Sequence, residues 1–547
     1  MRRKWLKGAL WVLLTPIVLF VILMILLYVP PVQNFIRKQA TAIASDATGM
    51  NISVERIDLR FPLNLLVRGV QVVQSEADAA DVQHPDTLLN LGSLNVSVQA
   101  WPLLQGRVEV NAITLQQVAV NSSNLLEGMH IKGTLGRFFL ESHGIDLKKE
   151  DAILNNVELS NTHMQVMLAD TTETPKDSTE TAVNWRIALH NLKLKNVSVD
   201  LQMPLDSMAL GANIGDASIE DANLDLKRQF YGWRRFTLTE SAVNYDLGMA
   251  APVEGFDASH IALRDIRIGI DSVMACGRDM NAIIREFSMY DRSGLTVTSL
   301  TGRLFADSTL IRIPYLQLKT PHSDMDLTAQ TYWKLVDIPT TGHLSARFNA
   351  NIGKQDVLLF AGGLPETFKE AYPFRPLVIH AGTEGNLKQM QISRFTAELP
   401  GAFFLSGGGE LWNLTDSLTR NGGLDFEMQT QDLNFLTGLT GVTPDGSIIV
   451  PDSMNLVARL GLDGPQCNAI LKIKEGEGSL GLDAAYNLNT EVYHADLAID
   501  ALQLHHFLPK DSIYTLTARV TAKGQGVDVA SHKTCLLYTS DAADEAR

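Results

Sequence analysis

The stretch Leu192-Lys193-Leu194-Lys195-Asn196-Val197-Ser198-Val199 decides the fold that the sequence predicts. Two short runs of alternating apolar residues meet there across a two-residue break. Strict alternation places every second side chain on one face of a sheet. The break carries residues such as Asn196, Gly69 or Asp265, which suit a tight bend or a β-bulge.

The same pattern recurs at irregular spacing along the chain. The clear copies are Leu65/Val67 with Val70/Val72, Ile113/Leu115 with Val118/Val120, Ile261/Leu263 with Ile266/Ile268, and Ile311/Ile313 with Leu316/Leu318. The weaker copies are Val157/Leu159 with Thr162/Met164, Ala217/Ile219 with Ala222/Leu224, and Met390/Ile392 with Phe395/Ala397. Irregular spacing argues against a strict solenoid. The pattern therefore predicts a mainly β chain whose stacked short strands form a long sheet with one apolar face.

Composition excludes several classes of protein. The 547 residues are 45% hydrophobic and 7% aromatic, which is typical of an ordered β-rich chain. A formal net charge of −15 argues against a nucleic-acid partner. The 3 cysteines, Cys276, Cys467 and Cys535, lie far apart in the sequence and indicate neither a disulfide framework nor a metal site.

Residues 1–31 are predicted to form a basic cytoplasmic stub and a membrane anchor. The run from Gly8 to Val29 has about 22 residues without a charge, and a bilayer core needs about 20. Basic residues precede this run, which places the N-terminus in the cytoplasm. A cleaved signal peptide is disfavoured because the apolar core exceeds about 15 residues and no A-x-A site follows. The predicted lipid-facing anchor residues are Leu10, Leu14, Ile17, Phe20, Leu23 and Leu27.

Residues 32–49 are predicted to form a short amphipathic helix. Val32, Phe35, Ile36, Ile43 and Ala47 recur at helical spacing before Gly49. This helix is expected to cover the open first edge of the sheet, and the alternative is a helix that lies on the membrane surface.

Residues 50–530 read as strand and turn, with strands of about 10 residues. The polar stretches 75–86 and 170–181 are expected to be loops, and short helices are expected around Glu366–Ala371 and Leu433–Leu439. The last residues, 531–547, resemble a translated sequencing-adaptor peptide, and we exclude them from the predicted fold as non-native.

No motif in the sequence indicates catalysis, a cofactor or a bound metal. Gly476 to Gly481 match G-x-G-x-x-G, but alternating residues follow, so a turn and a strand are predicted in place of a dinucleotide site. His505 and His506 are adjacent, and neighbours in a strand point to opposite faces, which makes a poor chelate. The sequence therefore predicts a protein that is not an enzyme.

Several short segments resemble a known family. They are 29–36, 48–52, 65–72 and 86–89 near the N-terminus, and 292–295, 407–411 and 523–526 downstream. Their order resembles that of TamB proteins, the inner-membrane subunit of the translocation and assembly module, within the wider AsmA-like group and with the character of Bacteroidota-type members. The resemblance implies a partner, an outer-membrane Omp85-type β-barrel, which such proteins are thought to meet through a C-terminal domain that this sequence is expected to be missing.

The resemblance implies an elongated U-shaped β-groove, or β-taco, that extends from the inner membrane through the periplasm. It also implies transport of phospholipid toward the outer membrane, and an older proposal is help with barrel-protein assembly. At about 4.8 Å per strand, some 480 residues in strands of about 10 would extend on the order of 200 Å.

The apolar face could instead close as a packed β-sandwich or filled β-helix. Aliphatic residues dominate the motif positions and aromatic residues are scarce there, which favours an open groove for acyl chains. The alternative function is a scaffold that templates outer-membrane strands by β-augmentation; an adhesin or glycan-binding protein would need more exposed aromatics. The candidate lipid-groove residues are Val67, Val70, Leu115, Val118, Val120, Leu194, Val197, Val199, Ile266, Ile268, Ile313 and Leu316.

Overall fold

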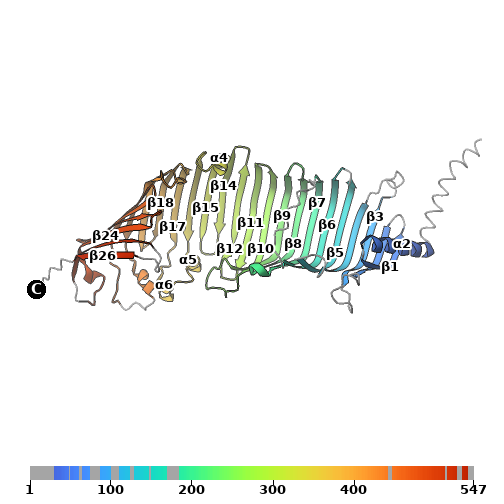
Figure 1. The fold of residues 1–547 in the computed structure, drawn as a ribbon, viewed down its shortest axis with the longest axis horizontal. Helices are drawn as coiled ribbons and strands as arrows, with labels where there is room; N and C mark the ends of the chain where they lie inside the picture. Colours follow the sequence, from blue (N-terminus) through green and yellow to red (C-terminus); the bar gives the residue numbers. More distant parts are fainter. Residues whose placement is uncertain are drawn as a thin grey trace, which may run out of the picture. The chain divides into compact units, whose positions relative to one another are not determined.

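The computed structural model of the chain describes residues 30–48, 50–60, 64–73, 87–99, 110–122, 129–146, 149–168, 184–440, 446–511, 514–526 and 533–539. The chain divides into two compact units. The first unit is Met1–Ala251 with Ala258–Gly277, and the second is Pro252–Asp257 with Arg278–Arg547. Each unit is built mainly of β-strands that lie side by side in a curved sheet (Figure 1). The prediction of a mainly β chain is confirmed.

The first unit contains one helix, one short 3-10 helix and strands β1 to β10 among its described residues. Their bounds are α2 Pro30–Thr48, β1 Asn51–Arg60, β2 Asn64–Val73, β3 Thr87–Val98, β4 Val110–Asn121, β5 Met129–Asp146, β6 Asp151–Leu168, β7 Arg186–Met203, η1 Pro204–Asp206, β8 Met208–Asp225, β9 Phe230–Leu247 and β10 His260–Cys276. Each strand pairs with the next. The pairs are antiparallel except β6 with β7, which is parallel.

The second unit contains strands β11 to β26 and several short helices among its described residues. Their bounds are β11 Asp279–Asp291, β12 Thr296–Val297, β13 Ser299–Ala306, β14 Leu310–Lys319, β15 Asp324–Tyr332, α4 Trp333–Asp337, β16 Leu344–Ile352, α5 Lys354–Leu359, α6 Glu366–Ala371, β17 Leu377–Asn386, β18 Gln389–Leu399, β19 Phe403–Trp412, β20 Asn421–Thr430, η2 Asn434–Thr440, β21 Asn455–Asp463, β22 Gln466–Glu475, β23 Gly478–Asn487, β24 Val492–Gln503, η3 Leu504–His506, β25 Thr515–Gln525 and β26 Lys533–Thr539. Strand β11 pairs with β12 and β13, and every strand from β13 to β26 pairs antiparallel with the next.

Each copy of the two-run motif lies inside a single strand, and the break between the runs is a kink in that strand. In six copies the second residue of the break has a positive φ, between 50° and 59°; these residues are Gly69, Gln117, Asn161, Asn196, Asp221 and Asp265. In all of these copies except that of β10, the pairing register is the same on both sides of the kink, because the residue opposite on the neighbouring strand is left unpaired as well. The register shifts, as at a β-bulge, beside Asp265 in β10, between Ile313 and Leu316 in β14, and between Ile392 and Phe395 in β18. The unpaired residue at each kink changes the phase of the alternation, so both runs point to the same face.

Strand length differs from the prediction in the first unit. Strands β5 to β9 have 18 residues each, where about 10 were expected. A kink bends a strand without ending it, so one strand carries both runs. The expected extension of on the order of 200 Å assumed strands of about 10 residues, and therefore assumed too many strands.

The helix predicted at 32–49 corresponds to α2, Pro30–Thr48. The predicted anchor, Gly8 to Val29, and the predicted loops at 75–86 and 170–181 lie outside the described residues. Among the helices that are described, none combines the length and apolar character needed to span a bilayer. Part of the tail that the sequence analysis excluded belongs to the sheet, because β26 pairs along β25.

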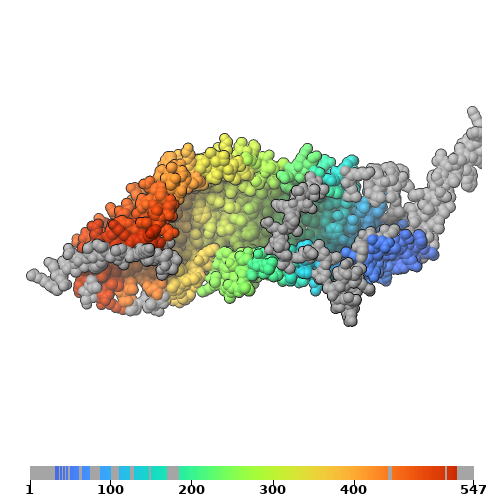
Figure 2. All heavy atoms as spheres, viewed as in Figure 1, coloured from blue at the N-terminus to red at the C-terminus, as the bar shows by residue number. Residues whose placement is uncertain are grey.

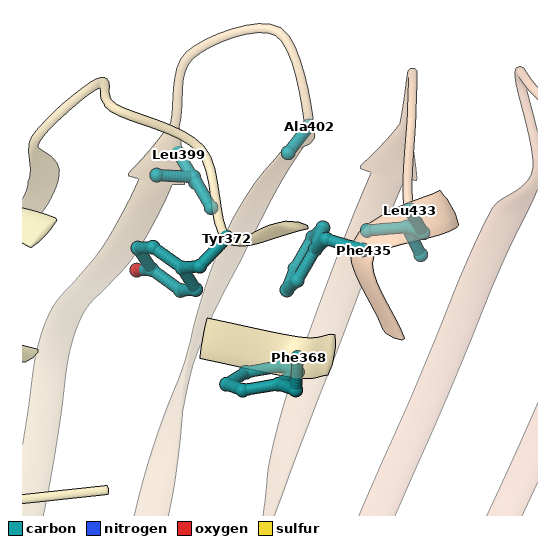
Figure 3. Packing of buried hydrophobic residues seen from close by; sticks show 6 residues of the cluster. All are labelled: Phe368, Tyr372, Leu399, Ala402, Leu433 and Phe435. Atoms are coloured by element: carbon teal, nitrogen blue, oxygen red, sulfur yellow. The ribbon is translucent and has the colours of Figure 1, made fainter. Parts of the chain in front are cut away.

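The predicted helix at Glu366–Ala371 is confirmed as α6, and that at Leu433–Leu439 is the 3-10 helix η2, Asn434–Thr440. Together they cover one end of the second unit's strands with a packed apolar core (Figure 3). Its members are Phe368, Tyr372, Leu399, Ala402, Leu433 and Phe435. Leu399 is 1% exposed, and the Tyr372 and Phe435 rings pack edge to face at 5.5 Å. Burial raises the pKa of the Tyr372 phenol above its ordinary value.

Candidate functional site

The pairing register aligns the motif positions of neighbouring strands into apolar rows. Residues that lie opposite each other in paired strands share a face of the sheet. One row in the first unit consists of Val67, Leu94, Leu115, Phe138, Leu159, Leu194, Ala217, Leu238 and Ile268. The next consists of Val70, Leu91, Val118, Leu135, Thr162, Val197 and Ile214, and a third contains Val120 and Val199. The register thus brings the candidate groove residues of different strands onto one face.

The kinks also align, in a line between the first two rows. From β2 to β8 the line consists of Gly69, Gly92, Gln117, Gly136, Asn161, Asn196 and Gly215. Where β6 meets β7, two positive-φ residues lie side by side, and the Asn196 amide nitrogen donates to the Asn161 amide oxygen at 3.2 Å. Because each kink bends its own strand, aligned kinks form one crease across the sheet of the first unit.

In the antiparallel pairs of this line, a glycine lies opposite each of Gln117, Asn161 and Asn196. A Cβ on Gly92 would lie 2.9 Å from the Gln117 Cβ, and a Cβ on Gly136 would lie 2.8 Å from the Asn161 Cβ. These glycines were not among the residues predicted from the sequence. Their signal is the same apolar-x-x-apolar spacing with glycine at the second position, as in Leu91-Gly92-Ser93-Leu94.

The second unit carries a comparable apolar face. One row crosses β11 and β13 to β25 without a polar side chain: Ile284, Gly302, Leu316, Leu327, Phe348, Ala381, Phe395, Gly407, Phe426, Ala458, Leu471, Leu482, Leu497 and Val520. Ile313 lies in the adjacent row, opposite Ala329. Phenylalanines are more frequent here than the motif positions indicated, and the Phe395 and Phe426 rings pack edge to face at 6.3 Å.

Most residues on these rows are half-buried. Among the candidate groove residues, Val197 and Ile266 beside the crease are 6% and 4% exposed, while Val120 and Val199 are both 37% exposed. The other candidates are intermediate. A packed sandwich would bury this face to interior density. Figure 2 shows a hollow over the yellow-green strands of the second unit, which agrees with an accessible face there.

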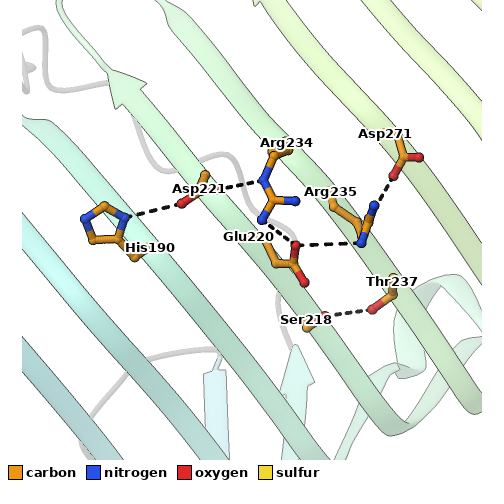
Figure 4. Close-up of polar contacts among 8 residues, drawn as sticks. All are labelled: His190, Ser218, Glu220, Asp221, Arg234, Arg235, Thr237 and Asp271. Atoms are coloured by element: carbon orange, nitrogen blue, oxygen red, sulfur yellow. Dashed lines mark hydrogen bonds and ion pairs between the residues drawn. The ribbon is translucent and has the colours of Figure 1, made fainter.

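The opposite face of the first unit is polar and ion-paired (Figure 4). Arg234 of β9 bonds Asp221 of β8 at 2.7 Å and Glu220 at 2.8 Å, and His190 of β7 lies 3.3 Å from Asp221. The Arg234 guanidinium, and after it His190, lower the pKa of the Asp221 carboxyl below its ordinary value. Asp221 is itself a kink residue with φ 50°, so these bonds connect three strands at a second kink position.

The remaining sequence motifs fall outside the apolar face. Gly476 and Glu477 form the turn between β22 and β23, as predicted. His505 and His506 belong to η3, where a strand was expected, and His506 Nδ1 lies 2.6 Å from the buried Glu475 carboxylate. Within the part of the chain that the structure describes, no group of three His, Cys, Asp or Glu side chains could hold a metal ion.

No protein-family model matches the chain, and no curated protein is significantly similar to it. The resemblance to TamB and AsmA-like proteins therefore stays a prediction that rests on the short segments quoted above.

Proposed function

We propose that this protein shields phospholipid acyl chains on its apolar sheet face and conducts them toward the outer membrane. The observation that carries the proposal is the row from Ile284 to Val520, which lacks polar side chains, lies on one face and is not packed as an interior. Contiguous exposed apolar surface beyond a few hundred Å² is typical of binding sites for proteins, membranes or ligands.

The chemistry of the face favours hydrocarbon as its ligand. Inner strands pair on both edges, so their backbone amides and carbonyls are already satisfied. The side chains of the rows add no hydrogen-bonding groups except occasional threonines. Each CH₂ group moved from water onto such a face gains about 0.8 kcal/mol. An acyl chain therefore binds well, whereas a polar ligand would lose hydration without compensation.

The proposed setting is a single-pass inner-membrane protein with a cytoplasmic N-terminus, as in the family it resembles. The bulk would form a U-shaped groove in the periplasm, and an outer-membrane β-barrel would be the distal partner. Helix α2 would cap the first edge. In support, Arg37 Nη1 donates to the carbonyl oxygens of Val54 and Glu55 on β1 at 3.1 and 2.9 Å. That contact also counts against strand templating at this edge, which needs free backbone groups.

A matched pair of charge substitutions tests the proposal. Val120 and its neighbour Ala119 are both exposed but lie on opposite faces of β4. The purified full chain is incubated with phosphatidylethanolamine vesicles, separated from them, and its bound phospholipid is measured by mass spectrometry. Val120→Asp is expected to reduce bound lipid severalfold, whereas Ala119→Asp should retain it. Equal binding by both variants, or no bound lipid in the parent protein, would contradict the proposal.

A further inference from the structure

A trough with a volume of about 520 Å³ lies in the apolar face of the second unit. Its floor is a row of alanines, Ala469, Ala484 and Ala495, which lie opposite one another on β22, β23 and β24. Leu460 of β21 and Leu424 of β20 continue this row and also line the trough. The neighbouring row on one side is Leu471, Leu482 and Leu497, and the row on the other side is Cys467 with the large side chains of Tyr486 and Tyr493. Because the alanines lie between rows that carry larger side chains, the trough runs across the strands.

The lining restricts what the trough can hold. The lining contains no Asp, Glu, Lys or Arg, and its polar residues besides the tyrosines are Asn468 and His494. Its strands are paired on both edges, so an added β-strand would find no backbone partners. The flanking rows are four residues apart along each strand, or about 13 Å between backbones. Their side chains narrow this space below the roughly 10–12 Å diameter of an α-helix. Because a β-strand finds no backbone partners and an α-helix is too wide, the occupant that fits is an extended hydrocarbon chain.

We propose that this trough holds a single acyl chain of a phospholipid, lying across β22 to β24. The apolar face would then contain a discrete holding site in place of a uniform floor, an inference that rests on the proposed function. Tyr486 and Tyr493 lie next to strand ends, near the border of the face. Tyrosine favours such borders because its ring is apolar and its hydroxyl is polar, so the lipid's polar end would lie on that side.

Two native cysteines provide a direct test. Cys467 lines the trough, whereas Cys276 ends β10 in the first unit, and both are free and half-buried. In a Cys535→Ser background of the full chain, the rate of maleimide modification is measured for each cysteine, with and without palmitoyl-oleoyl phosphatidylethanolamine vesicles. Saturating lipid should slow modification of Cys467 at least about fivefold and leave that of Cys276 unchanged.

A matched pair on β24 separates occupation of the trough from general coverage of the face. Ala495 lies on the floor, and Ala498 is exposed on the opposite face of the same strand. Ala495→Trp fills the trough and should abolish protection of Cys467, whereas Ala498→Trp should retain it. Where Ala495→Trp does not fold, Ala495→Leu takes its place.

The outcomes distinguish this inference from the proposed function. Persistent protection of Cys467 in both Ala495 variants, or unprotected Cys467 in a protein that still binds lipid, would overturn the holding site alone. A protein that binds no phospholipid at all would overturn both proposals.

Discussion

Gly92 of β3 and Gln117 of β4 lie opposite each other in the crease, where Gln117 has φ 55° and a Cβ on Gly92 would lie 2.9 Å from the Gln117 Cβ. In this antiparallel pair, the left-handed Gln117 therefore leaves no room for a side chain at the residue opposite it. The same relationship joins Gly136 to Asn161. The crease is thus specified by pairs of residues on adjacent strands.

Replacement of Gly92 by alanine should destabilise the first unit. The added methyl meets the Gln117 Cβ, and relief requires a backbone shift, so we expect a loss of about 1–3 kcal/mol in the free energy of unfolding. Urea denaturation of the full chain measures it. Gly481→Ala on β23 is the control, since a Cβ there meets nothing within 4 Å; a similar loss in both variants would contradict the account.

Two valines of one motif copy should respond differently to a charge. Val197 is 6% exposed beside the crease and Val199 is 37% exposed on the open part of the face. Val197→Asp should cost more than about 3 kcal/mol in unfolding free energy, because it buries an unpaired carboxylate. Val199→Asp should cost less than about 1 kcal/mol but reduce lipid binding. Loss of folding in both variants would indicate that the face is a closed core.

Asp221 predicts a pH dependence of stability. Arg234 and His190 lower its pKa in the folded chain, so its ionised form is stabilised by folding. That stabilisation is present above the ordinary aspartate pKa of 3.8 and is lost as the pH falls through the lowered value. The urea midpoint of Asp221→Asn should therefore fall below that of the parent at pH 6 and approach it near pH 3.

The Asp221 effect should be small and should decrease in high salt, since the pair is exposed. In an Arg234→Gln background the Asp221→Asn substitution should lose most of its effect on stability, as a double-mutant cycle would measure. An effect of Asp221→Asn that does not change with pH would contradict the ion-pair account.

The core beneath α6 should behave as a conventional packed interior. Phe435 is 9% exposed among the rings of Phe368 and Tyr372, so Phe435→Ala should cost about 3–5 kcal/mol. Phe404 on β19 is 41% exposed, and Phe404→Ala should cost less than about 1 kcal/mol. Equal losses in thermal unfolding would contradict this distinction between core and surface.

The local sequence pattern predicted the strands and their apolar face, but it could not predict which strands pair. Alternation around Asn196 indicated strands with one apolar face, and the residue type at the break indicated a tight bend or a bulge. The parallel pairing of β6 with β7 was not predictable, because it depends on a connection rather than on either strand. The phenylalanines at 348 and 426 and the alanine floor were also missed, since they lie outside the motif copies and gain meaning only from the register.

The most direct test scans β7 with a photo-crosslinking amino acid at each position from Leu192 to Val199, in the full chain with phosphatidylethanolamine vesicles. The kink at Asn196 shifts the alternation, so both runs share the lipid-binding face. Phospholipid should be captured at Leu192, Leu194 and Val199, and not at Lys193, Lys195 or Ser198. Capture at Ser198 in place of Val199, equal capture at all positions, or capture of outer-membrane proteins with no lipid would contradict the central claim.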